Sequence, residues 1–154
     1  NGSDITITLL RSPTEPNPVA DKGHHEFTYA LLPHNCSLSE SRTVLESYKL
    51  NAKPICREIS AHNGSLPEEF SLVSASSETV VIEVVKKAED DDGLIVRLYE
   101  HGNRRENVTL TFGFPVHEAF VCNLMEKEEG TLNVDDRTVS FDIKPFEIVT
   151  LKVK

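Results

Sequence analysis

The sequence predicts an all-β fold, an antiparallel β-sandwich with one short helix near residues 38–50. Three observations support this fold class: apolar residues alternate with polar ones along much of the chain, the alternating segments are short and regularly spaced, and turn-forming residues separate them. Because successive side chains of a strand point to opposite faces, this alternation is typical of strands with one buried face. Many such strands at regular spacing favour a sandwich.

The first two predicted strands lie near the start of the chain. The first covers residues 5–9 and the second covers residues 24–34. Their apolar faces consist of Ile5, Ile7 and Leu9 in the first strand and of Phe27, Tyr29 and Leu31 in the second. Between them, residues 13–18 contain three prolines and predict an extended loop that cannot join a central ladder.

Six further strands follow, with dipeptides and tripeptides that favour turns between them. Their apolar positions are Val80, Ile82 and Val84; Leu94, Val96 and Leu98; Val108, Leu110, Phe112 and Phe114; Phe120, Cys122 and Leu124; Val139, Phe141 and Ile143; and residues 148–153. The turn signals are Asp92-Gly93, His101-Gly102-Asn103, Glu129-Gly130, Asp135-Asp136 and Lys144-Pro145.

One segment departs from the strand pattern. Between residues 37 and 51, Val44, Leu45 and Tyr48 recur at helical spacing, and Ser37 or Ser39 with Glu40 could cap the N-terminus of the helix. Residues 61–69 follow as a loop, because Asn-Gly and Leu-Pro pairs interrupt any periodicity there.

Composition limits the class of protein. The 154 residues are 38% hydrophobic and 27% charged, which suits one core, so we expect residues 1–154 to form a single domain. The first residue is Asn1 and the sole methionine is Met125, so we expect a fragment of a longer polypeptide. Its net charge of −9, with basic residues scattered, disfavours nucleic acid as a partner.

Localisation is predicted from the cysteines and from the hydropathy. Three cysteines, an odd number without close metal-ligand spacing, argue against a disulfide framework and favour a reducing, cytoplasmic compartment. No apolar run reaches the roughly 18 residues of a membrane span, so no membrane partner is expected.

The densest polar cluster covers residues 21–26. In a strand beginning at His24, His24 and Glu26 face one side while His25 points with Phe27 to the other. His24 and Glu26 supply at most two metal ligands, and the remaining histidines form no metal-binding motif, so no metal site is predicted.

The sequence shows no signature of catalysis. The acidic pairs and triplets lie in turn or loop contexts, and there is no Gly-X-Ser-X-Gly motif and no phosphate-binding glycine loop. From the residues alone, the chain reads as a non-catalytic β-domain.

Several longer runs are shared with one known family. They are LLRSP at 9–13, PNP at 16–18, ADKGH at 20–24, EFTYAL at 26–31, PH at 33–34, YKLN at 48–51, VVKKAE at 84–89, VRLYE at 96–100, CNL at 122–124 and PFE at 145–147. In this order and spacing, the chain resembles the C-terminal region of family 38 glycoside hydrolases, the α-mannosidases of the cytosolic and bacterial branch. Asn17 departs from the pattern, since relatives often carry Asp there.

The resemblance implies a parent enzyme whose N-terminal catalytic domain and helical domain hold a zinc ion and the carboxylate nucleophile. Such enzymes are retaining hydrolases that remove terminal α-linked mannose through a covalent intermediate. For this chain the resemblance implies an inactive accessory domain with no cofactor of its own, which packs against the N-terminal catalytic and helical domains of the same enzyme.

The loop from Arg11 to His25 is the candidate substrate-binding segment. Arg11, Asp21, His24 and His25 offer hydrogen-bonding groups suited to mannose hydroxyls. Alternatively, Arg11 and Asp21 pair with each other and only hold the loop in place.

Two other functions remain open for the whole chain, an autonomous carbohydrate-binding module and a purely structural or oligomerisation domain. The absence of Trp and an aromatic content of 6% disfavour the binding module, which usually stacks sugars on aromatic rings.

Overall fold

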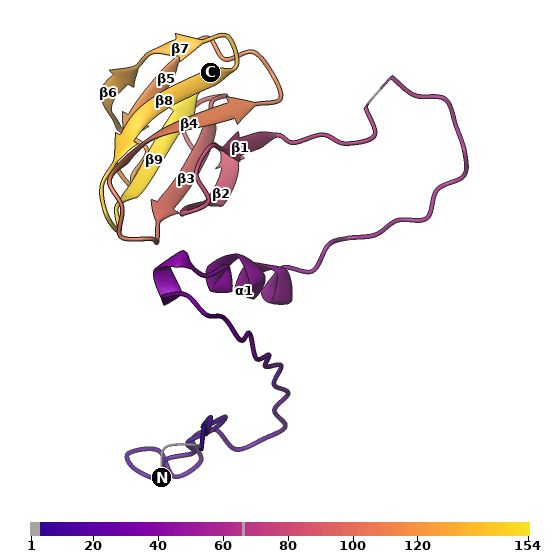
Figure 1. Cartoon of the computed structure of the whole chain (residues 1–154), viewed down its shortest axis with the longest axis vertical. Helices are drawn as coiled ribbons and strands as arrows, with labels where there is room; N and C mark the ends of the chain where they lie inside the picture. Colours follow the sequence, from indigo (N-terminus) through magenta and orange to yellow (C-terminus); the bar gives the residue numbers. More distant parts are fainter. Residues whose placement is uncertain (1–3, 66) are drawn as a thin grey trace. The chain divides into compact units, whose positions relative to one another are not determined.

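The computed structural model describes residues 4–65 and 67–154. The chain divides into two compact units, Asn1–Asn35 and Cys36–Lys154. All regular elements of the described residues lie in the second unit (Figure 1). They are the 3₁₀ helix η1 (Leu38–Glu40), the helix α1 (Thr43–Asn51) and the strands β1 (Val73–Ala75), β2 (Val80–Lys87), β3 (Leu94–Glu100), β4 (Glu106–Phe112), β5 (Ala119–Cys122), β6 (Glu128–Leu132), β7 (Val134–Asp135), β8 (Thr138–Ile143) and β9 (Ile148–Val153).

The strands form two antiparallel sheets that pack face to face. One sheet has the order β1-β4-β8-β7 and the other has the order β2-β3-β9-β5-β6. Every strand pair in both sheets is antiparallel. Figure 1 shows the two layers, with β4 and β8 lying across β9 and β3. The predicted antiparallel sandwich is therefore confirmed.

The core lies between the sheets and consists of the alternate apolar positions that the sequence pattern marked. Burying each such side chain contributes about 1.5–3 kcal/mol. The fully buried members include Val96 and Leu98 of β3, Val108 and Leu110 of β4, Val139 and Ile143 of β8, and Leu151 of β9. The predicted strands over 80–84, 94–98, 108–112, 120–122, 139–143 and 148–153 all occur, whereas Phe114 and Leu124 lie beyond the ends of β4 and β5.

The two strands predicted in the first unit do not form. Residues 4–10 and 24–33 have no strand assignment, and no backbone hydrogen bond joins the two segments among the described residues. Their apolar faces nevertheless meet, because Ile5, Ile7, Leu9, Tyr29 and Leu31 line one hollow of about 300 Å³. A two-stranded pair without further strands is marginally stable in water, so side-chain pairing alone does not produce a ladder here.

Three short strands, β1, β6 and β7, were not predicted from the sequence. β1 and β7 are edge strands of two or three residues, too short for a periodicity to be recognised. β6 contains the Glu129-Gly130 pair that predicted a turn, so that prediction is wrong. Four of the five β6 residues are exposed, and pairing with β5 at the sheet edge defines the strand.

The predicted helix near residues 38–50 occurs as two pieces, η1 and α1. The Ser37 backbone N–H and hydroxyl donate to Glu40 Oε2, at 3.2 and 2.7 Å, so Ser37 and Glu40 form a capping box at the start of η1. By contrast, α1 begins after Arg42 and has no side-chain cap. The helix is interrupted at Ser41, whose backbone is extended and whose hydroxyl accepts a hydrogen bond from the Thr43 N–H at 3.3 Å. Within the described part of the chain, no helix has the length and apolar character needed to cross a membrane.

Candidate functional site

The candidate loop from Arg11 to His25 belongs to the first unit. Two of its side chains contact the backbone carbonyl of Asp21. The Asp21 carbonyl lies 2.8 Å from His25 Nε2 and accepts a hydrogen bond from the Ser12 hydroxyl at 3.5 Å. Asp21 has a φ of 55°, and Gly23, two residues further on, has a φ of 143°. Because a residue with a side chain rarely adopts the conformation of Gly23, this glycine allows the tight backbone.

The histidines of this loop divide as the strand geometry predicted. His24 Nε2 lies 3.3 Å from Glu26 Oε1, and both side chains are largely exposed. The His25 ring stacks on Phe27, with centroids 5.9 Å apart and planes 9° apart. The alternation of side chains therefore persists although no ladder forms.

Arg11 and Asp21 are both exposed, and no ion pair joins them within the described residues. Their hydrogen-bonding groups are therefore available to a ligand.

The described residues contain no group of three or more His, Cys, Asp or Glu side chains that could hold a metal ion. The zinc ion implied by the resemblance has no ligand set in this part of the chain.

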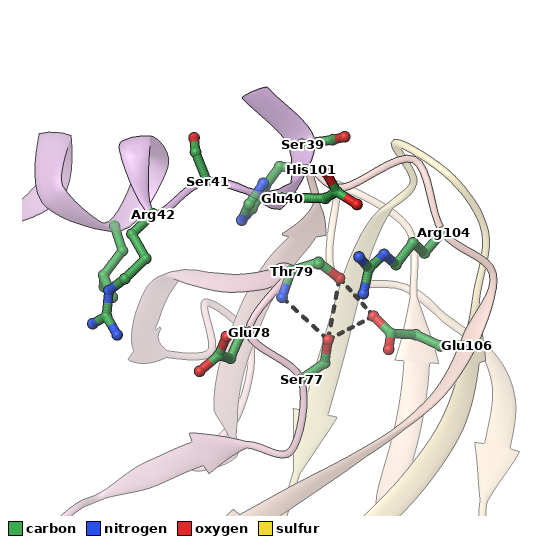
Figure 2. Close-up of a pocket in the computed structure, with 11 residues that line it drawn as sticks. Ser39, Glu40, Ser41, Arg42, Ser77, Glu78, Thr79, His101, Arg104 and Glu106 are labelled. Carbon is green, nitrogen blue, oxygen red and sulfur yellow. Dashed lines mark hydrogen bonds between the residues drawn. The ribbon is translucent and has the colours of Figure 1, made fainter. Parts of the chain in front are cut away.

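A second candidate site lies in the second unit, where a pocket of about 320 Å³ opens between the start of the helical segment and the sandwich (Figure 2). Most of its lining is polar. It is lined by Ser39, Glu40, Ser41, Arg42 and Leu45 from the helical segment, by Ser77, Glu78 and Thr79 before β2, and by His101, Arg104 and Glu106 around the β3–β4 turn.

Glu106, the first residue of β4, hydrogen-bonds to two other residues of the pocket lining. Its Oε1 accepts hydrogen bonds from the Ser77 and Thr79 hydroxyls, each at 2.6 Å. The two hydroxyls lie 3.1 Å apart, and the Ser77 hydroxyl also accepts the Thr79 N–H at 3.2 Å. This network fixes the segment that leads into β2 against the start of β4.

Glu100, at the end of β3, supports the turn beside the pocket. Its carboxylate is buried and accepts the N–H groups of Gly102 at 2.6 Å and Phe146 at 3.0 Å. Burial alone would raise the pKa of this carboxyl, but the hydrogen bonds from the backbone N–H groups hold the pKa below its ordinary value of 4.5. Glu100 is therefore a charged group that ties the β3–β4 turn to the β8–β9 turn.

Sequence reasoning missed this pocket. Its lining comes from three segments that are far apart along the chain, and none of them matches a binding motif. The one available signal was the His101-Gly102-Asn103 turn, which the sequence did place between two strands. Which side chains converge on that turn depends on the packing of the helical segment.

Comparison with known proteins identifies the family of the sandwich. Residues 79–151 match the model of the glycosyl hydrolases family 38 C-terminal beta sandwich domain. The chain is 35% identical to Alpha-mannosidase 2C1 of Homo sapiens over 97% of its own length and 15% of that protein. It is 30% identical to Alpha-mannosidase G of Dictyostelium discoideum over 98% of its length and 14% of that protein, and 31% identical to the Alpha-mannosidase of Saccharomyces cerevisiae over 99% of its length and 16% of that protein.

The two-sheet architecture and the matched residues together define a class, the β-sandwich domains of glycoside hydrolases. Within that class, residues 79–151 belong to the glycosyl hydrolases family 38 C-terminal beta sandwich domain. The chain spans about 15% of the length of the curated relatives that it matches.

Proposed function

We propose that this chain is the C-terminal accessory region of a retaining α-mannosidase, which removes terminal α-linked mannose from the non-reducing ends of its substrates. The observation that carries the proposal is the similarity to α-mannosidases over 97% or more of the chain, although the chain accounts for only about 15% of each of them. In this proposal the whole of residues 1–154 acts as one structural region, and the catalytic zinc ion and nucleophile lie in the N-terminal part of a cytoplasmic parent enzyme.

The exposed apolar side chains support a packing role. In the first unit, Leu31 is 76% exposed and Ile5 is 88% exposed. In the second unit, Leu124 and Ile148 share a hollow of about 370 Å³, and Met125 and Phe146 beside them in sequence are also exposed. Exposed apolar side chains that line one hollow, as Leu124 and Ile148 do, mark an interface. We assign these surfaces to contacts with the N-terminal catalytic and helical domains.

The loop from Arg11 to His25 then shapes the substrate cleft. Arg11 and Asp21 present exposed donors and acceptors, and the loop is held by the hydrogen bonds to the Asp21 carbonyl. Hydroxyl groups of mannose are both donors and acceptors, so they suit an Arg and Asp pair that is free of its own ion pair.

The test is kinetic. On an aryl α-mannoside, we expect no turnover by residues 1–154 alone, and in the full-length enzyme we expect Arg11→Ala and Asp21→Ala each to lower kcat/KM by roughly tenfold, about 1.4 kcal/mol of transition-state binding. Lys22→Ala is the matched control, since Lys22 lies in the same loop and is exposed.

Turnover by residues 1–154 alone would contradict the accessory role. Unchanged kinetics in both loop variants, with an intact fold, would instead favour a purely structural or oligomerisation domain without sugar contact.

A further inference from the structure

The pocket between the helical segment and the β3–β4 turn has no part in the proposed function, yet it has the features of a binding site. Its volume of about 320 Å³ lies at the lower end of the range of roughly 300–1,000 Å³ for small-molecule pockets. Such a volume suits one ring of a small ligand rather than a longer chain.

Part of the lining is fixed in advance. Glu106 is tied to Ser77 and Thr79, and Glu40 is tied to Ser37. The Thr79 and Ser41 residues are themselves buried. A ligand would therefore meet oriented carboxylate and hydroxyl groups, which reduces the entropy lost when it binds.

Other groups of the lining have unused hydrogen-bonding capacity. Among the described residues, the side chains of His101 and Glu78 make no hydrogen bond or ion pair, and the Arg42 guanidinium has a 3.7 Å ion pair with Glu46. The Arg104 guanidinium makes no hydrogen bond there, and its charge helps to lower the pKa of Glu40 on the same lining. Figure 2 shows the Arg104 guanidinium projecting toward Thr79 and Glu106. Donors and acceptors therefore stand side by side at the pocket wall.

The charges select the class of ligand. The lining carries three carboxylates, Glu40, Glu78 and Glu106, and two guanidinium groups, Arg42 and Arg104. An anion would be repelled by the carboxylates and a cation by the guanidinium groups. An uncharged ligand with several hydroxyl groups avoids both repulsions, because each hydroxyl donates to a carboxylate and accepts from a guanidinium group.

We propose that this pocket binds a single uncharged hexose unit through its hydroxyl groups. Leu45 and the His101 ring supply the limited apolar contact that the C–H faces of a sugar ring require, and Arg42, Arg104, Glu78 and Glu106 supply the polar contacts.

Titration of the isotope-labelled 154-residue chain with methyl α-mannoside tests the proposal by NMR. The backbone amides of Thr79, His101, Gly102 and Arg104 are expected to shift together and to saturate with a Kd on the order of 1 mM, as suits a ligand of about a dozen heavy atoms. This readout does not depend on turnover, so its failure is distinguishable from failure of the proposed accessory function.

Two neighbouring arginines provide a matched pair of variants. Arg104 lines the pocket and Arg105 does not, and both are exposed, so neither substitution disturbs the core. Arg104→Gln is expected to weaken binding by about tenfold or more, the effect of losing a charged hydrogen-bond donor, whereas Arg105→Gln leaves the Kd unchanged. Glu78→Gln is a second variant of the lining, with the exposed Glu69→Gln as its control. The spectrum of each variant without ligand confirms its fold.

Three outcomes would overturn the proposal: no saturable shift at the pocket amides, equal binding by Arg104→Gln and the unaltered chain, or saturable binding of inorganic phosphate at these amides without binding of the mannoside. The last result would assign the two arginines to an anion site.

Discussion

At the scale of single residues, Glu100 joins two turns of the sandwich. Its carboxylate is buried and accepts two backbone N–H groups from two different turns. Each N–H left without an acceptor in a buried position costs about 1–3 kcal/mol. Glu100 therefore holds together the ends of the β3–β4 and β8–β9 connections.

Glu100→Gln is expected to lower the free energy of unfolding at pH 7 by about 1–3 kcal/mol, because the amide NH₂ replaces one acceptor oxygen with a donor. Since the folded-state pKa of Glu100 lies below 4.5, its contribution is present above about pH 4.5 and is lost as the pH falls through the lowered value. The difference between the two proteins should shrink below that pH. Urea unfolding at several pH values measures it, with the exposed Glu129→Gln as control.

Gly102 illustrates a second constraint on the same turn. A Cβ at this position would lie 2.6 Å from Thr79 Cγ2 and 2.9 Å from Thr79 Cβ. These distances are shorter than van der Waals contact, and Thr79 cannot withdraw without breaking its hydrogen bond to Glu106.

We expect Gly102→Ala to destabilise the chain by about 1–3 kcal/mol, as overpacking of a filled site does. Gly130→Ala is the matched control, because a Cβ there meets no atom within 4 Å. Thermal unfolding of both variants checks the prediction, and equal melting temperatures would show that the turn accommodates the methyl group.

At the scale of elements, α1 is attached differently from the strands. No residue of α1 is buried, so its position depends on polar contacts rather than on apolar packing. The Tyr48 hydroxyl lies 3.0 Å from the Tyr99 hydroxyl of β3 and donates to the Glu83 carboxylate of β2. The hydrogen bond to Glu83 raises the pKa of Tyr48 strongly, so Tyr48 stays protonated and remains a donor.

Tyr48→Phe is expected to release α1 while leaving the sandwich intact. Amide hydrogen exchange should become faster over residues 43–51, because a nine-residue helix is marginal without tertiary contacts. Exchange in β3 and β9 should not change. Tyr29→Phe, which removes an exposed hydroxyl from the first unit, is the control. Unchanged exchange in α1 would show that other contacts hold the helix.

The strands also show how far the sequence predicts single elements. Strands with a buried face, such as β3, β4, β8 and β9, were predictable because burial imposes the alternation that the sequence displays. β6 was not predictable, because an exposed edge strand requires no such alternation. The apolar alternation in residues 5–9 and 24–34 predicted two strands that do not form, since a ladder depends on backbone partners. The meeting of their apolar side chains in one hollow was not predicted.

At the scale of the whole molecule, large apolar side chains are exposed in both units of the described chain. Leu124 and Ile148 are 66% and 63% exposed and line the same hollow. In the proposed parent enzyme, this surface is covered by the preceding domains, and its burial contributes about 25 cal/mol for each Å² removed from water.

Replacing Leu124 and Ile148 together by Ser is therefore expected to leave the melting temperature of the 154-residue chain nearly unchanged. In the full-length enzyme the same change should loosen this region and make it more susceptible to limited proteolysis. Ile55→Ser, which alters an exposed apolar residue outside the sandwich, is the control. Unaltered proteolysis of the double variant would exclude this surface as the interface.

The sequence by itself determined the all-β class, the positions of the main strands along the chain, the helical segment and the family. Burial periodicity, turn chemistry and residue identity, on which these depend, are all local properties. It also identified the exposed groups of the Arg11–His25 loop, whose proposed contact with substrate stays a prediction. Only the tertiary structure decided how the strands divide between two sheets and which polar side chains converge on the pocket beside Glu106. Those relations join residues far apart in the chain, and they arise from packing that no local pattern encodes.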